Sequence, residues 1–307
     1  MNAKTKGIAW YLGITFGLAW TTWEVGIRAG VPVSSAQFQI LALPGAFAPA
    51  IAAIVVRRWI TREGFGDAGL GVHVRRWPYY LFAWLLPLGI VGAIIAESWG
   101  LGLAKPDFTL ARAIASPAMG PTAMAIASSG HPVVPQLLLT ALASAPILWG
   151  EEFGWRGYLQ QRLYTDRPVY AALATGAIWA VWHFPLTLRG YDYPDHPLWG
   201  SLVLIPVAIL FSYVFAWILR RSGSIWASSL AHAATNGVGG MLMMLWFGGA
   251  SGPTILSYGG VLAIPPLFIV CACIRYFPSQ DAGGLSPNVL ASPHQKGALS
   301  ASSKVRG

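Results

Sequence analysis

Long apolar runs divide the chain into segments that are each about as long as a bilayer is thick. A helix needs about 20 mostly apolar residues to cross the hydrocarbon core, and runs of this kind follow one another between short polar stretches. We predict transmembrane helices at 8–28, 36–56, 79–97, 135–155, 169–188, 199–219, 225–246 and 255–275. The predicted fold is therefore all-α: a polytopic membrane helical bundle with about eight transmembrane helices.

Two segments lack the apolar length of a span. Residues 98–134 are rich in Pro, Gly, Ala and Ser, and we expect them to form an external loop. Residues 278–307 are rich in Ser, Gly and Pro and lack an apolar period, which is typical of a disordered tail. The chain then divides into N-terminal transmembrane helices with the external loop at 1–134, a membrane core at 135–277 and a cytoplasmic tail at 278–307.

The composition excludes a large soluble enzyme. Charged residues make up 10% of the chain, whereas soluble proteins contain about 25%. Hydrophobic residues make up 55%, and the mean hydropathy is +0.55. A chain of this composition cannot cover itself with polar groups in water, so we expect lipid to surround most of it.

The basic residues predict an orientation in the membrane rather than a nucleic-acid partner. The net charge of +9 is spread over short clusters between apolar runs, without a basic face or stripe. If the N-terminus is cytoplasmic, all but four of the 20 Lys and Arg residues fall inside, and the four outside are Arg28, Lys105, Arg112 and Arg189. This bias follows the positive-inside rule. We therefore expect a multi-pass protein of the plasma (inner) membrane with both termini in the cytoplasm.

A small set of polar residues lies within or at the ends of the predicted spans, where ionisable groups are costly and mostly face the bundle interior. They are Glu24, Glu151, Glu152, Arg156, His183, His232 and Asn236. Glu24 lies near the outer end of its span without a partner pattern, so we expect it to be structural. The others fall in three different helices and are the candidate site residues.

Their spacing favours a common cavity. Residues four apart share a helix face, which pairs Glu152 with Arg156 and His232 with Asn236. In a purely structural role, Glu152 and Arg156 would form an ion pair at the membrane edge, and each histidine would form an inter-helix hydrogen bond. Two histidines beside a glutamate pair make a purely structural role less favoured.

Three known patterns of intramembrane hydrolases are absent from the chain or incomplete in it. The zinc signature HExxH is absent. GFGD at 64–67 resembles an aspartyl-protease motif, but the second membrane aspartate that would share its proton is missing. GASG at 249–252 resembles a serine-protease motif, but the only downstream histidine lies in the tail. We treat both matches as accidental.

The remaining motifs are EEFGWR at 151–156, WAVWH at 179–183 and HAATN at 232–236. In this order the chain resembles the CAAX-processing and bacteriocin-processing (CPBP or Abi) family of intramembrane proteases, which is related to the type II CAAX prenyl protease. The resemblance covers about residues 135–245. Trp179 stands where the family usually has Phe, which affects the expected substrate fit more than the expected catalysis.

The resemblance implies an intramembrane endopeptidase whose core at 135–277 cleaves membrane-associated, lipidated or leader-peptide substrates. A glutamate carboxylate can take a proton from water, His183 can orient that water, and His232 and Asn236 can donate to the oxyanion. Alternatively, Glu151, His183 and His232 could hold Zn²⁺, which would acidify the water. Both routes remain open from the sequence, with a slight preference for zinc because neutral histidine suits it.

We expect the two glutamates to have different roles. Adjacent helix residues point about 100° apart, and Glu152 is spaced to pair with Arg156. Glu151 is then free to face the two histidines as base or ligand. The converse holds if the helix is kinked near Gly150.

A non-enzymatic function is the alternative. Buried charges also form ion or proton pathways in transporters, and the same residues could build a binding site in a bacteriocin-immunity or scaffold protein. The ordered set of three motifs favours the protease.

Overall fold

The structure is a computed structural model that describes residues 2–33, 35–116, 119–248 and 257–276. The N-terminal part contains α1 (Ala3–Arg28), α2 (Ala36–Ala46), α3 (Ala48–Val55), the π-helix η1 (Val56–Ile60), the short η2 (Val74–Arg76), α4 (Trp77–Gly100), α5 (Ala111–Ala115) and α6 (Pro121–Ala127). The central part contains α7 (Val133–Gly154), the π-helix η3 (Trp155–Leu159), α8 (Gln160–Arg162), α9 (Pro168–Trp182), α10 (Phe184–Thr187) and α11 (Pro197–Ser222). The C-terminal part contains α12 (Ile225–Ala234), the π-helix η4 (Thr235–Gly240), α13 (Met241–Phe247), η5 (Val261–Ala263) and α15 (Ile264–Tyr276).

Four helical stretches in these described ranges are long and apolar enough to cross a membrane. They are Ala36–Ile60, Val74–Gly100, Val133–Arg162 and Pro197–Ser222. They correspond to the second, third, fourth and sixth predicted spans. Every regular element of the described part is helical, so the predicted all-α polytopic membrane bundle is confirmed.

The other four predicted spans are also helical, with different bounds. The first lies within α1, and the seventh is divided into α12, η4 and α13. The fifth is shortened to the 15 residues of α9, because Pro185 has no backbone N–H and its ring clashes with the preceding turn. The eighth begins only at Val261 in the described residues. The total of eight spans therefore stays a prediction, and the predicted tail at 278–307 lies outside the described residues.

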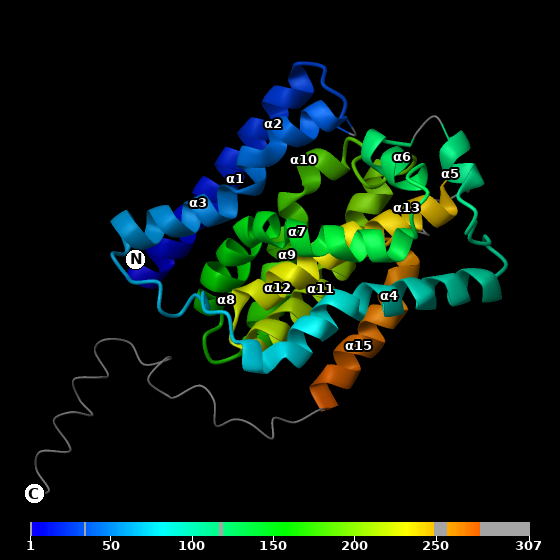
Figure 1. Ribbon diagram of the computed structural model, residues 1–307. Helices are drawn as coiled ribbons and strands as arrows, with labels where there is room; N and C mark the ends of the chain where they lie inside the picture. Colours follow the sequence, from blue (N-terminus) through cyan, green and yellow to red (C-terminus); the bar gives the residue numbers. More distant parts are fainter. Residues whose placement is uncertain (1, 34, 117–118, 249–256, 277–307) are drawn as a thin grey trace, which may run out of the picture.

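The helices that carry the candidate site lie in the middle of the bundle. In Figure 1, α1, α2 and α3 lie together on one side, α4 and α15 on the other, and α7, α9, α11 and α12 between them. The central helix α7 packs against α3 and α12, while α9 packs against α11. The described residues between α4 and α7 form only the short helices α5 and α6, so the predicted external loop contains no described span.

Two glycines allow the central helices to approach closely. A Cβ atom at Gly176 in α9 would lie 2.6 Å from Ile209 Cα in α11. At Gly154, at the end of α7, a Cβ would clash with the side chain and backbone of Pro49 in α3. Small residues at such crossings let helix backbones pack without intervening side chains. The glutamate pair of α7 and the aromatic motif of α9 are thus held on helices in close backbone contact with their neighbours.

Candidate active site

Five of the six predicted site residues are linked to one another at the end of α7 by short contacts. Glu151 and Glu152 lie in the last turn of α7, Arg156 in η3, and His232 in α12, while His183 caps α9. Trp179 of α9 contacts both histidine rings edge-on, with ring centroids 5.5 Å from His183 and 5.1 Å from His232. Residues from three separate helices therefore meet at one place, as the motifs indicated.

Glu152 is the centre of a buried ion network. Its Oε1 accepts hydrogen bonds from Arg156 Nη1 at 2.8 Å and from His232 Nδ1 at 2.9 Å. Glu152 and Arg156 are both 0% exposed. The predicted pairing of Glu152 with Arg156 is confirmed, and His232 joins it from a helix 80 residues further along the chain.

The Arg156 guanidinium lies between two aromatic rings. Its Cζ is 4.8 Å from the ring centroid of Trp179 and 5.1 Å from that of Phe215. Aromatic faces attract a cation, and more so when both are desolvated. Among the described residues, Arg156 Nε and Nη2 and Glu152 Oε2 have no hydrogen-bond partner. Native proteins pair nearly all buried polar atoms, so these three atoms retain donor and acceptor capacity for a group that enters the site.

Glu151 is held differently from its neighbour. The indole N–H of Trp179 donates to Glu151 Oε2 at 2.9 Å. The other oxygen of Glu151 has no hydrogen bond to the described residues, and the side chain is 8% exposed, in contrast to the complete burial of Glu152. Glu151 thus keeps one carboxylate oxygen accessible beside the histidines.

His183 has a defined orientation. Its Nδ1 lies 2.9 Å from the backbone oxygen of Trp179. A carbonyl only accepts hydrogen bonds, so Nδ1 carries the proton and the Nε2 lone pair faces away from α9. By the same argument, His232 Nδ1 donates to the carboxylate of Glu152, which leaves Nε2 of His232 for other partners. Each histidine is therefore oriented by one of its two nitrogens.

The structure corrects the expected division of the glutamates in one respect. Glu151 alone was expected to face the two histidines, but Glu152 forms the direct bond to His232. The reason is that α12 packs against α7 on the side to which Glu152 points. Glu152 therefore holds both Arg156 and His232 in place through hydrogen bonds to its Oε1.

Asn236 departs from the expected shared face. It is exposed and lies in the π-helix η4, and its side chain forms no hydrogen bond with the described residues. A π-helix bonds residues five apart and has more residues per turn than an α-helix, so a residue four positions after His232 no longer lies directly above it. A second π-helix, η3, carries Arg156, and such insertions are frequent at functional sites.

Sequence reasoning missed two contacts. Glu24, expected to lack a partner, forms ion pairs with Arg189 at 2.6 Å and Arg28 at 3.6 Å. Both arginines were placed on the outer side by the charge pattern, which is consistent with their meeting at one end of the bundle. The bond from Trp179 to Glu151 had one available signal, since Trp carries an N–H that Phe lacks.

The three proposed zinc ligands do not gather as a metal centre. No group of three His, Cys, Asp or Glu side chains in the described ranges is placed to hold a metal ion. Glu151 is held by Trp179, and the Trp179 ring contacts both His183 and His232. The arrangement therefore does not fit the expected Zn²⁺ site, and the steps proposed below use protein groups alone.

The buried pair makes a testable contribution to stability. Arg156→Met leaves the Glu152 carboxylate in an apolar site without its cation, which costs about 3–5 kcal/mol for a buried pair. Adding Glu152→Gln removes the uncompensated charge while keeping an acceptor for His232. We therefore expect the double variant to unfold at a higher temperature than Arg156→Met in a thermal-unfolding assay in detergent. A double variant that is less stable than Arg156→Met would show that no charge compensation occurs.

Comparisons with known proteins agree with the three motifs. Residues 132–238 match the family model of type II CAAX prenyl endopeptidase Rce1-like proteins. A curated relative, CAAX prenyl protease 2 of Methanococcus maripaludis, is 29% identical over 109 residues, which cover 34% of this chain. The match spans 39% of the length of that relative. The resemblance predicted from the motifs is thus confirmed for the segment that carries them, and this segment is similar to the type II CAAX prenyl endopeptidases.

Proposed function

We propose that this protein is an intramembrane endopeptidase that hydrolyses peptide bonds of membrane-associated substrates. One observation carries the proposal: Glu151 keeps an accessible carboxylate oxygen beside two oriented histidines, inside a membrane bundle. The match of residues 132–238 to a prenyl endopeptidase family and the printed name of the relative support a proteolytic activity.

In the proposed first step, Glu151 acts as general base. A water between the accessible oxygen of Glu151 and Nε2 of His183 gives its proton to the carboxylate. The oxygen of this water attacks the scissile carbonyl carbon. Trp179 orients Glu151 through its indole N–H, and the backbone of Trp179 orients His183.

In the second step, His232 stabilises the charge that develops on the carbonyl oxygen. Its Nδ1 is held by the Glu152 carboxylate, so Nε2 is the ring nitrogen that can donate to the oxyanion when the ring carries a proton on both nitrogens. The exposed amide of Asn236 is available as a further donor once a substrate is bound. The tetrahedral adduct then breaks at its C–N bond, and Glu151 passes the proton to the leaving nitrogen. The products are a carboxylate and an amine.

The proposed orientation places the site toward the cytoplasmic face. Glu151 lies in the last turn of α7, and the predicted topology puts that end of the span on the side of Arg156 and Arg162. A substrate would therefore approach from the cytoplasmic leaflet of the plasma membrane. Lipidated C-termini and leader peptides both present a peptide bond close to that surface.

The accessible oxygen of Glu151 generates the first functional prediction. Glu151→Gln removes the base, so we expect loss of peptide hydrolysis with an unchanged unfolding temperature. Glu152→Gln should reduce activity and lower the unfolding temperature, because Arg156 and His232 both lose their carboxylate. Cleavage of a fluorogenic membrane peptide beside thermal unfolding measures both effects. An inactive, stable Glu152→Gln protein with an active Glu151→Gln protein would reverse the two roles.

Zinc dependence is tested separately. No three His, Cys, Asp or Glu side chains of the described ranges are grouped so as to hold a metal ion, so we expect peptide hydrolysis to survive prolonged chelation of the purified protein. Metal content should be measured on the same sample, with activity compared before and after zinc is restored. If chelation abolishes peptide hydrolysis and added Zn²⁺ restores it, the reaction depends on zinc and the proposed mechanism without a metal is wrong.

Trp179 generates a third functional prediction. Trp179→Phe keeps an aromatic ring but removes the N–H that holds Glu151. A hydrogen bond to a charged group contributes about 1.5–3 kcal/mol, so we expect kcat to fall about 10-fold or more with little change in KM. This expectation replaces the one drawn from the motif, that a Phe at this position would mainly change the substrate fit. Trp149→Phe is the matched control, because the Trp149 indole N–H has no partner in the described residues. Equal kcat values for the two variants would contradict a positioning role for Trp179.

A further inference from the structure

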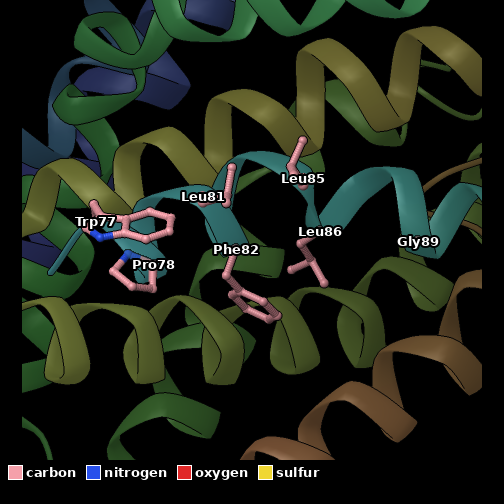
Figure 2. Close-up of a pocket in the computed structure, with 7 residues that line it drawn as sticks. All are labelled: Trp77, Pro78, Leu81, Phe82, Leu85, Leu86 and Gly89. Carbon is pink, nitrogen blue, oxygen red and sulfur yellow. The ribbon is translucent and has the colours of Figure 1, made fainter.

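An apolar groove runs along the outer face of α4, away from the candidate active site. Its volume is about 450 Å³, and it extends from Trp77 to Gly89. Figure 2 shows the side chains of Leu81, Phe82 and Leu85 following one another along the helix between these ends. Gly89 keeps the far end open, since no atom lies within 4 Å of a Cβ placed there.

The groove has about the length of one bilayer leaflet. Twelve residues of α-helix rise about 18 Å, and half of the hydrocarbon core is about 15 Å thick. Leu81 and Leu85 remain 39% and 37% exposed in the isolated chain. One acyl chain lying parallel to α4 would therefore fill the groove from the membrane surface toward the bilayer midplane.

Basic residues surround the surface end of this groove. Arg75 and Arg76 directly precede Trp77, and Arg220 and Arg221 lie in the last turn of α11. The two helices are antiparallel here, because the Tyr79 and Trp217 rings are 5.6 Å apart and a Cβ at Gly223 would lie 3.3 Å from the His73 ring. The four arginines therefore occupy the same membrane level.

Aromatic contacts connect the arginines to the groove wall. The Arg221 guanidinium carbon lies 5.6 Å from the centroid of the Trp217 ring. The Trp217 ring also contacts the ring of Phe82, a groove residue, with a centroid distance of 5.5 Å. Tryptophan and tyrosine concentrate at the level of lipid head groups, which places the arginines where a phosphate would lie.

From this combination we propose that the groove is a binding site for one anionic phospholipid. Its acyl chain lies along α4 between Trp77 and Gly89, and its phosphate is bound by Arg75 of η2 and Arg220 of α11. Basic clusters beside transmembrane helices attract anionic head groups, and a zwitterionic lipid would lack the net charge that they recognise. The proposal is independent of the proteolytic activity.

Native mass spectrometry of the full chain in mild detergent provides the test. The protein is mixed with equal amounts of phosphatidylglycerol and phosphatidylcholine of the same chain length. We expect one phosphatidylglycerol to be retained at least tenfold in preference. Arg75→Gln with Arg220→Gln should reduce this preference by roughly fivefold for each arginine, the effect of one basic residue near an anionic surface.

A groove-filling variant tests the acyl position. Gly89→Leu fills the open end and is favoured by helix propensity, so we expect bound phosphatidylglycerol to be lost with the fold intact. Gly92→Leu is the matched control: it also lies in α4 with open space around its Cβ, but outside the groove, and should retain the lipid.

Three results would overturn the proposal. Equal retention of the two lipids would indicate ordinary boundary lipid only. Unchanged lipid binding in the double arginine variant would remove the head-group site. A Gly89→Leu protein that retains phosphatidylglycerol but shows a raised KM for a lipidated peptide would assign the groove to the substrate chain.

Discussion

Glu152 and Arg156 are both completely buried in an apolar bundle, and a charge in such surroundings requires a close partner. Each supplies the other with that partner, at 2.8 Å. The pair then attracts further groups: His232 from α12 hydrogen-bonds the same carboxylate oxygen, and the rings of Trp179 and Phe215 lie against the guanidinium. The helices that carry these groups are therefore joined through one charge network.

The network gives the adjacent carboxylates of Glu151 and Glu152 different hydrogen-bond partners and therefore different roles. Glu152 is occupied by a cation and a histidine, so it has little freedom to accept a proton from a substrate or water. Glu151 is bound through one oxygen by an indole N–H, and the other oxygen stays accessible. Two identical side chains thus acquire different environments, which is the usual basis for assigning different chemical roles to paired acids.

Close helix packing maintains this geometry. The glycines at 154 and 176 bring α7 against α3 and α9 against α11 without intervening side chains. The π-helices η3 and η4 then alter the register directly after the glutamate pair and after His232. A small rotation at either insertion would move Arg156 or Asn236 relative to the neighbouring helices, since a π turn shifts the faces of all later residues.

The sequence by itself determined the features that are local along the chain. Apolar run length predicted the helical class and eight spans, and four helical stretches of the described residues are long and apolar enough to cross a membrane. A spacing of four residues predicted the Glu152–Arg156 pair. Only the tertiary structure decided that Glu152 binds His232, that Trp179 holds Glu151, and that Asn236 is exposed. The first two contacts join residues 80 and 28 positions apart, and they depend on how helices are rotated about their axes. Helix periodicity states which residues share a face, but the packing of neighbouring helices decides what that face meets, and a π insertion changes the face itself.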